Sequence, residues 1–421
     1  MVSRRDFISL LGSSIATSGV TWAQTPSARV VLYASVGPEL TQYDVDVDTA
    51  TLVRRASVML PAGVQYAWPH VSGQYLYVAS SNGGVGLGAS AGGSHHATVF
   101  RIDPSSGALA SHGDPISLPS RPIHITTDIP SQHVLIAYNS PSRITVHPVN
   151  SDGTLGNEIK QQATIDAGIY AHQTRVVPSN RSVILVARGN DASAGRPEDP
   201  GALKIFDFKD GLLTDEASIA PGGGYGFGPR HLDFHPTQPW IFVSLERQNQ
   251  IWVYKLDGNG VNPEPLFKTS TLADPSNVRP RQLAGTVHVH PNGRFVYGVN
   301  RADGTMESDG RRVFIGGENG IVVYAINPNT GEPTRIQNAD TRGIHARTFH
   351  IDPSGRMLVA ANIMPLSVRD NATVMTVPAN LSVFRIDGDG KLDFVRKYDV
   401  DVGNASMFWM GMVKLPQHGK Q

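Results

Sequence analysis

Six copies of one strand-turn-strand pattern run through this chain, and this repeat limits the fold more than any other feature. Each copy pairs a short alternating strand with a continuous apolar run across a turn of four or five residues, which is typical of an antiparallel hairpin. The copies are Trp68–Ser80, Ile125–Asn139, Thr174–Arg188, Leu232–Glu246, Val287–Asn300 and Phe349–Asn362. Their turn positions recur every 48 to 62 residues, at Val71, Pro130, Pro178, Pro236, Pro291 and Pro353. That period indicates the radially repeated blades of a β-propeller.

A seventh copy is present in two halves at the ends of the chain. Val30–Ser35 matches only the second strand of the pattern, and Phe408–Val413 is the last apolar run. Pairing these segments would close the ring and cover two sheet edges that otherwise favour aggregation. The sequence therefore predicts an all-β, seven-bladed propeller of four-stranded antiparallel blades, closed by its N- and C-terminal strands.

The N-terminus has the form of a bacterial twin-arginine export signal. The motif Ser3-Arg4-Arg5-Asp6-Phe7-Ile8 is followed by a weakly apolar stretch rich in Ser and Gly that extends to Ala23. We expect cleavage near Ala23, a periplasmic product, and one propeller domain over residues 24–421.

Composition excludes several classes of function. The 36 basic and 36 acidic residues give no net charge, so no basic field favours nucleic acid or an anionic membrane surface. The chain has no cysteine, which excludes disulfides, thiolate metal sites and a cysteine nucleophile. Nothing after the leader approaches an 18-residue apolar span. We expect a monomer with no nucleic-acid partner, no membrane partner after cleavage, no metal and no cofactor.

Aligning the six copies on their turns collects polar residues at two positions. Six residues before the turn position stand Gln65, His124, His172, Arg230, Gly285 and Arg347, and ten residues after it stand Ser81, Ser140, Arg188, Glu246, Arg301 and Ile363. In an antiparallel hairpin the start of the first strand lies beside the end of the second. Both sets are therefore predicted to lie on the rim opposite the turns.

The lengths of the connections favour the same rim. Four segments that leave the second strand are long, namely Ser81–Ala97, Gly189–Gly201, Ala302–Asn319 and Ile363–Ala379. Because binding sites are usually carried by variable loops on a rigid scaffold, we place the active site at this mouth of the central funnel.

A glutamate, a histidine and several arginines suit the attack of water on an activated carbonyl. Glu246 or His172 would take the proton of the water, and Arg230 with Arg301 would stabilise the oxyanion. A lactone is reactive enough to need no covalent nucleophile. The same groups could also run the reverse, ring-closing reaction. Arg347, Arg188, His124 and Gln65 are expected to bind the substrate.

The segment Gly226–Tyr254, GFGPRHLDFHPTQPWIFVSLERQNQIWVY, resembles the propeller lactonase family that includes bacterial 6-phosphogluconolactonase and fungal carboxy-cis,cis-muconate cyclase. Further similar stretches are Ala171–Gln173, His290–Arg301 and Ala346–Asn362. The resemblance implies a site at His172, Arg230, Glu246 and Arg301. The export signal and the 302–319 insertion depart from the family. Periplasmic gluconolactonases within the family are the most similar, which implies glucono-1,5-lactone as substrate.

Other interpretations stay open for several of these residues. His172 could cap a strand, and Glu246 could be an ion-pair partner only. His235 and His290 are possible metal ligands, but each precedes a turn Pro, which favours turn capping. Alternative functions are carboxymuconate cyclisation, hydrolysis of 6-phosphogluconolactone, and a non-catalytic propeller that binds a periplasmic partner.

Overall fold

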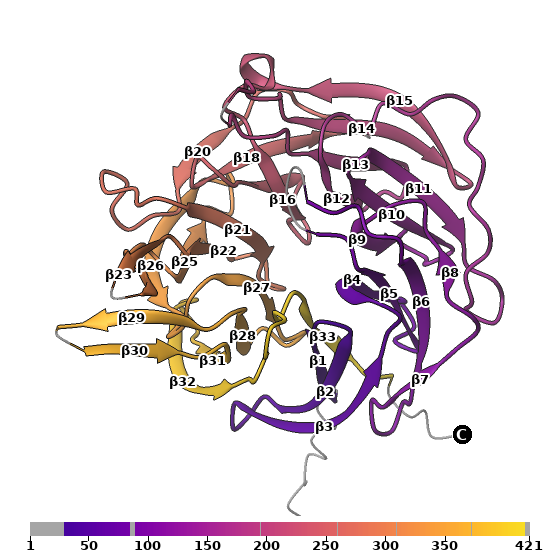
Figure 1. The fold of residues 1–421 in the computed structure, drawn as a ribbon. Coiled ribbons are helices and arrows are strands. Elements are labelled where there is room, and N and C mark those ends of the chain that lie inside the picture. The colour runs from indigo at the N-terminus through magenta and orange to yellow at the C-terminus, as the bar shows by residue number, and fades with distance from the viewer. Residues whose placement is uncertain are drawn as a thin grey trace, which may run out of the picture.

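The computed structural model describes residues 29–416 except 85–88, 194, 259, 309 and 372. Seven β-sheets stand around one axis, and the chain runs through them in sequence order (Figure 1). The predicted seven-bladed propeller is therefore confirmed. The predicted export signal lies outside the described residues. No helix in the described part of the chain is long and apolar enough to cross a membrane.

Each blade is a meander that starts at the axis. From the axis outwards the first three blades are β33 (Met410–Lys414), β1 (Val30–Val36), β2 (Glu39–Asp46) and β3 (Thr51–Met59); β4 (Gly63–Pro69), β5 (Tyr75–Ser81), β6 (His95–Ile102) and β7 (Leu109–Ser111), with β8 (Ile116–Ser117) also on β6; and β9 (Pro122–Thr127), β10 (His133–Asn139) and β11 (Ser142–Pro148).

The other four blades follow the same plan. They are β12 (Ala171–Val176), β13 (Ser182–Ala187), β14 (Ala202–Lys209) and β15 (Leu212–Ile219); β16 (Pro229–Phe234), β17 (Trp240–Leu245) and β18 (Gln250–Asp257) with β19 (Gly260–Val261) and β20 (Phe267–Ser270); β21 (Gln282–Val289), β22 (Phe295–Ala302), β25 (Gly320–Ile326) and β26 (Pro333–Asp340); and β27 (Ala346–Ile351), β28 (Met357–Asn362), β31 (Asn380–Ile386) and β32 (Leu392–Asp399). A short 3₁₀ helix, η1 (Pro221–Gly224), precedes β16.

The ring is closed as the sequence predicts. Strand β1 pairs with β33 in antiparallel register, with Val31 opposite Val413. Three blades depart from the four-stranded plan. In two of them a pair of short strands takes the outer place, β7 and β8 on β6 and β19 and β20 on β18. The β9–β11 sheet has three strands, and after β11 Val149 is bridged to Leu155.

The core consists of seven clusters of buried apolar side chains, one between each pair of neighbouring blades. The continuous apolar runs of the sequence form the second strand of each blade, which is buried on both faces. Burial on both faces explains why these strands lack the alternation of a half-exposed strand.

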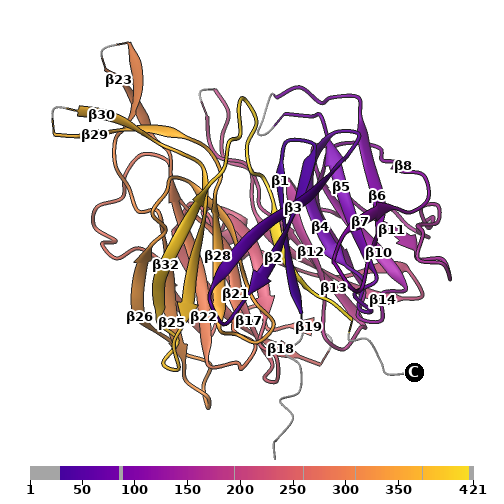
Figure 2. The ribbon, with the colours of Figure 1, turned by 90° about the horizontal axis from the view of Figure 1, so that it is seen from below.

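Two of the long segments form structure that the sequence did not indicate. The insertion after β22 folds into the hairpin β23 (Thr305–Ser308) and β24 (Arg311–Phe314), and the one after β28 into β29 (Leu366–Asp370) and β30 (Thr373–Val377). Strands β24 and β29 meet in parallel at Val313 and Ser367. The resulting eighth sheet projects beyond one rim of the ring (Figure 2).

Candidate active site

A β-bulge marks the same place in the inner strand of six blades. In β4, β12, β16 and β27 the bulged residue, which has no partner on the second strand, is Gln65, His172, Arg230 or Arg347. In β21 the bulge contains Gly285 and Thr286. A bulge breaks the alternation of a strand and re-aims a side chain. The position six residues before the turn is therefore a structural feature of the repeat.

In the third blade the bulge lies one residue earlier than the sequence alignment predicts. In β9 the bulged residue is Ile123, because Pro122 and His124 pair with consecutive residues of β10. A slip of one residue moves a side chain to the other side of its strand. His124 is consequently fully buried below the rim, where its ring lies 4.1 Å from that of Tyr66, while Ile123 lines the rim cavity.

Glu246 lies at the centre of a buried ion cluster. Its carboxylate accepts hydrogen bonds from Arg188 and Arg301, and its Oε1 lies 2.9 Å from Nε of Arg230. Burial alone would raise the pKa of Glu246, but the three guanidinium groups outweigh it and hold this pKa well below its usual value. Glu246 is therefore ionised at neutral pH and is a weak base.

A cavity of about 550 Å³, which we call the arginine cavity, opens above this cluster. Of the predicted site residues, His172, Arg188, Glu246, Arg301 and Arg347 line it. Arg230 is only 1% exposed and lies behind Glu246. Gln65 and His124 do not line the cavity; Gln65 instead accepts a hydrogen bond from Arg121. The volume is within the range of about 300–1,000 Å³ that small-molecule sites have.

Positive charge exceeds negative charge around this cavity. Arg347 stacks on Phe408, with its Cζ 3.7 Å from the ring centroid, and donates from Nε to the Phe408 carbonyl at 3.2 Å. Among the described residues neither Arg347 nor Arg121 has a carboxylate within 4 Å. Burial, and then the charges of Arg230, Arg301 and Arg121, lower the pKa of Arg347 well below its ordinary value. The site is arranged to receive negative charge.

His172 brings a neutral imidazole to the same cavity. Burial first, and then the positive charge of Arg230, hold its pKa well below the ordinary value of histidine. Its Nδ1 is buried and has no hydrogen-bond partner among the described residues. The ring is therefore neutral at neutral pH and, like Glu246, a weaker base than usual.

Sequence reasoning missed an imidazole-carboxylate pair on the opposite wall. His345 Nε2 accepts a hydrogen bond from Nη1 of Arg301 at 3.1 Å, and its Nδ1 lies 3.2 Å from Oδ2 of Asp303. Burial lowers the pKa of His345 to about 4, so the ring is neutral with its proton on Nδ1. Asp303 directly follows β22 and His345 directly precedes β27, positions that the alignment on turns did not compare.

The histidines beside the turns cap those turns, as predicted. His235 Nδ1 accepts from the backbone N–H of Gln238 at 2.9 Å, and His290 Nδ1 accepts from that of Asn292 at 3.1 Å. Their Nε2 atoms reach the carbonyls of Gly293 and Gly355 in the next blade, both at 2.8 Å. Within the described ranges no group of three or more His, Asp or Glu side chains is arranged to hold a metal ion.

Comparison with known proteins agrees with the seven-bladed propeller described above. The family model described as "Lactonase, 7-bladed beta-propeller" matches residues 31–407. A 6-phosphogluconolactonase of Bacillus subtilis (strain 168) is 28% identical over 300 residues, which is 68% of this chain and 77% of that protein. A 6-phosphogluconolactonase of Pectobacterium carotovorum is 29% identical over 264 residues, which is 62% of this chain and 69% of that protein.

Solved structures share the fold at lower sequence identity. The periplasmic gluconolactonase PpgL of Pseudomonas aeruginosa aligns over 93% of this chain and 100% of its own, with a TM-score of 0.67 and 20% identity. A putative 6-phosphogluconolactonase of Bacteroides uniformis ATCC 8492 aligns over 92% and 99%, with a TM-score of 0.69 and 19% identity.

Proposed function

Because the chain belongs to the lactonase family of seven-bladed β-propellers, we propose that it hydrolyses an aldonolactone, namely glucono-1,5-lactone, to the aldonate in the periplasm. The observation that carries this proposal is the arginine cavity. It combines an excess of guanidinium groups with a neutral imidazole, His172, that has a free ring nitrogen. Such a set matches a reaction in which a neutral ester becomes an oxyanion and then a carboxylate.

The arginines would hold the lactone carbonyl and the oxyanion that forms from it. Arg301 and Arg188 share the carboxylate of Glu246, which fixes their guanidinium groups at the cavity wall. Arg347 has no carboxylate partner in the described part of the chain, so its charge is available to the ligand. Donors held in place before the reaction stabilise the transition state without reorganisation.

His172 would act as the proton acceptor, and Glu246 would position the arginines. Water attacks the carbonyl carbon and gives one proton to Nδ1 of His172, forming a tetrahedral oxyanion. The intermediate then collapses, the bond from the carbonyl carbon to the ring oxygen breaks, and His172 returns the proton to the leaving alkoxide. The carboxylic acid product loses its own proton to solvent.

Two further observations support the sugar and the compartment. The N-terminal motif around Arg4 and Arg5 is the form of a twin-arginine signal, and a structural neighbour carries the name periplasmic gluconolactonase. A phosphorylated sugar lactone is a cytoplasmic compound, so an exported enzyme would meet the unphosphorylated lactone.

One observation favours a second candidate, an anionic lactone. Arg121 is 4% exposed, and its Nε and Nη1 have no hydrogen-bond partner among the described residues. Together with Arg347 it could bind a phosphate or a second carboxylate. 6-Phosphogluconolactone, or the product of a carboxymuconate cyclisation, would satisfy both groups.

The test is a lactone panel followed by proton release. Protein lacking residues 1–23 is mixed with glucono-1,5-lactone, 6-phosphogluconolactone or a dicarboxylated muconolactone, with and without a chelator. We expect the first to open faster than in buffer alone, with no effect of the chelator. Preference for an anionic lactone supports the second candidate, and folded protein that opens none of the three refutes the proposal.

A further inference from the structure

A second set of residues lies nearer the turns, three residues before the turn position in five of the blades. It consists of Trp68 of β4, Arg175 of β12, Asp233 of β16, His288 of β21 and His350 of β27. All five line one cavity of about 370 Å³ on the propeller axis, which we call the axial cavity. Five blades thus contribute the same repeat position to one cavity.

A layer of rings separates the axial cavity from the arginine cavity. The ring of Tyr66 lies 4.1 Å from that of His124 and 6.4 Å from that of His231, and the His231 ring lies 5.2 Å from that of His172. Tyr66 lines the axial cavity and His172 lines the arginine cavity. A ligand in one cavity therefore does not touch the residues of the other.

The polar wall of the axial cavity is held together by Asp233. Its Oδ1 accepts from Nη2 of Arg175 at 3.1 Å, and its Oδ2 accepts from the backbone N–H of Val289 at 2.9 Å. His288 Nδ1 lies 3.5 Å from the same Oδ2. Burial would raise the pKa of Asp233, but Arg175 and His288 outweigh it and lower this pKa to about 2. The carboxylate and the guanidinium therefore neutralise one another.

The remaining polar groups include both donors and acceptors. Arg175 keeps N–H groups that Asp233 does not use. His350 is neutral because burial lowers its pKa to about 3, and its Nδ1 is buried with no hydrogen-bond partner among the described residues. A buried polar atom without a partner calls for a bound group. Hydroxyl groups fit this mixture, since each can both donate and accept.

Aromatic side chains lie among these polar groups. Tyr66, Trp68, Phe349 and Trp409 line the cavity, and the Arg175 guanidinium stacks over Trp68 with its Cζ 5.0 Å from the ring centroid. Flat aromatic faces bind the apolar C–H face of a ring whose edge carries polar groups. A ligand of this cavity therefore needs one apolar face, several hydroxyls and no net charge.

We propose that the axial cavity is a binding site for a neutral pyranose, such as a monosaccharide. The volume is within the range of small-molecule sites, and the paired charges of Arg175 and Asp233 discriminate against a phosphorylated sugar, which would bring an uncompensated charge. This proposal is independent of the lactonase activity, because it uses none of the residues of the arginine cavity.

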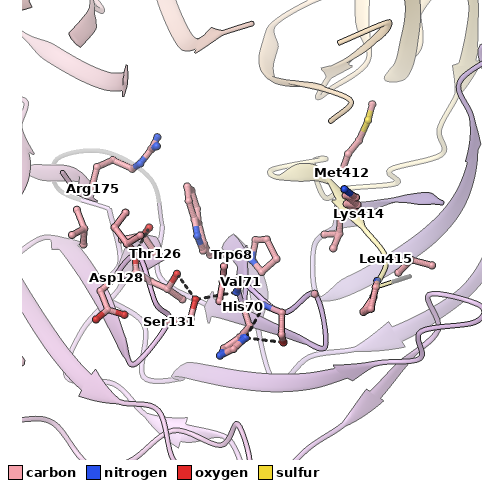
Figure 3. Close-up of a pocket in the computed structure, with 18 residues that line it drawn as sticks. Trp68, His70, Val71, Thr126, Asp128, Ser131, Arg175, Met412, Lys414 and Leu415 are labelled. Carbon is pink, nitrogen blue, oxygen red and sulfur yellow. Dashed lines mark hydrogen bonds between the residues drawn. The ribbon is translucent and has the colours of Figure 1, made fainter. Parts of the chain in front are cut away.

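Access is from the face that carries the turns. A wider depression of about 640 Å³ opens there and shares Trp68, Arg175 and Met412 with the axial cavity. Figure 3 shows Trp68 between Arg175 on one side and Met412 and Lys414 on the other. A sugar would enter through this depression and stack on Trp68.

The proposal is tested by titrating the whole chain without its leader with glucose, myo-inositol and glucose 6-phosphate. Binding is followed by tryptophan fluorescence and by saturation-transfer NMR. We expect saturable binding of a neutral ring, weaker binding of glucose 6-phosphate, and at least a tenfold loss of affinity in Trp68→Ala. His350→Leu, which keeps the side-chain volume, should weaken binding similarly and guards against a folding defect in the first variant.

The control is Arg347→Ala, which changes the arginine cavity only and should bind the sugar like the parent protein. The absence of saturable binding of either neutral ring would overturn the proposal. Binding lost in Arg347→Ala but kept in Trp68→Ala would also overturn it, because the sugar would then occupy the arginine cavity.

Discussion

Replacing Glu246 by Gln tests the central claim that one carboxylate is the shared counter-ion of three guanidinium groups. The change keeps the shape of the side chain but leaves the buried Arg230 and Arg301 without a counter-charge, while Arg188 keeps only the exposed Asp191. Removing one partner of a buried ion pair costs about 3–5 kcal/mol. A chain of this length unfolds with an entropy of about 0.8 kcal/mol/K, so we expect Tm to fall by about 4–6 °C.

The matched control is Asp191→Asn. Asp191 also pairs with Arg188, at 3.0 Å, and with Arg247, at 2.8 Å, but its side chain is 49% exposed. Exposed pairs contribute about 0–1 kcal/mol each, so this variant should melt within about 2 °C of the parent. Thermal denaturation followed by circular dichroism measures both variants. Equal stability of the two would refute the argument that Glu246 is the counter-ion of the cluster.

The same substitution separates a positioning role of Glu246 from a role as the base. With misplaced arginines we expect kcat to fall about 100-fold. In the smaller variant Glu246→Ala, added formate should restore part of both Tm and kcat by replacing the missing carboxylate. If formate restores Tm but no activity, Glu246 does more than hold the arginines, and His172 is not the sole proton acceptor.

Three further predictions follow from the geometry. Arg347→Ala should lower kcat/KM about 10²- to 10³-fold without lowering Tm, because no carboxylate among the described residues would be left unpaired. The control Arg342→Ala, at an exposed arginine, should change neither quantity. A fall in the Tm of Arg347→Ala would contradict this prediction. His172→Gln should lower kcat. In the parent enzyme the acid limb of the pH profile of kcat should lie well below pH 6.5, because the pKa of His172 is lowered. An acid limb near pH 6.5 would exclude His172 as the base. The pKa of Asp233 is lowered to about 2, so its ionised form should contribute about 2 kcal/mol of stability above pH 4 that is lost as the pH falls toward 2. The free energies of unfolding of the parent and of Asp233→Asn, measured by urea denaturation, should therefore converge over that range.

The ring and most of the rim were predictable because the repeat itself encodes them. Apolar runs and turn residues mark each hairpin, and the two half-copies at the ends predicted the β1–β33 closure. The alignment failed at His124, because one turn is offset by a residue and no single sequence shows which residue bulges. The pairing of β24 with β29 was equally hidden, since two insertions far apart in sequence meet only after the ring has formed.

Residues that act through tertiary contacts were harder to find. Arg121, His345 and Asp303 stand outside the compared positions, and no local pattern marks them. What distinguishes them is their surroundings. No carboxylate of the described residues lies within 4 Å of Arg121, and His345 links Arg301 to Asp303. The composition, with equal numbers of acidic and basic residues, conceals the local excess of positive charge.

The repeat explains how one scaffold can carry two different sites. The bulged position near the rim places His172, Arg230 and Arg347 toward the arginine cavity, and the position three residues before the turn places Arg175 and Asp233 toward the axial cavity. Both positions lie on the inner strands, whose backbones are fixed by pairing with buried second strands. Side chains there can vary without loss of the ring, because the seven apolar clusters that stabilise it lie between the blades. The two cavities differ in charge. Guanidinium groups outnumber carboxylates in the arginine cavity, whereas the charges of Arg175 and Asp233 cancel in the axial cavity. A ligand that becomes an anion is therefore matched to the rim, and a ligand that stays neutral is matched to the axis.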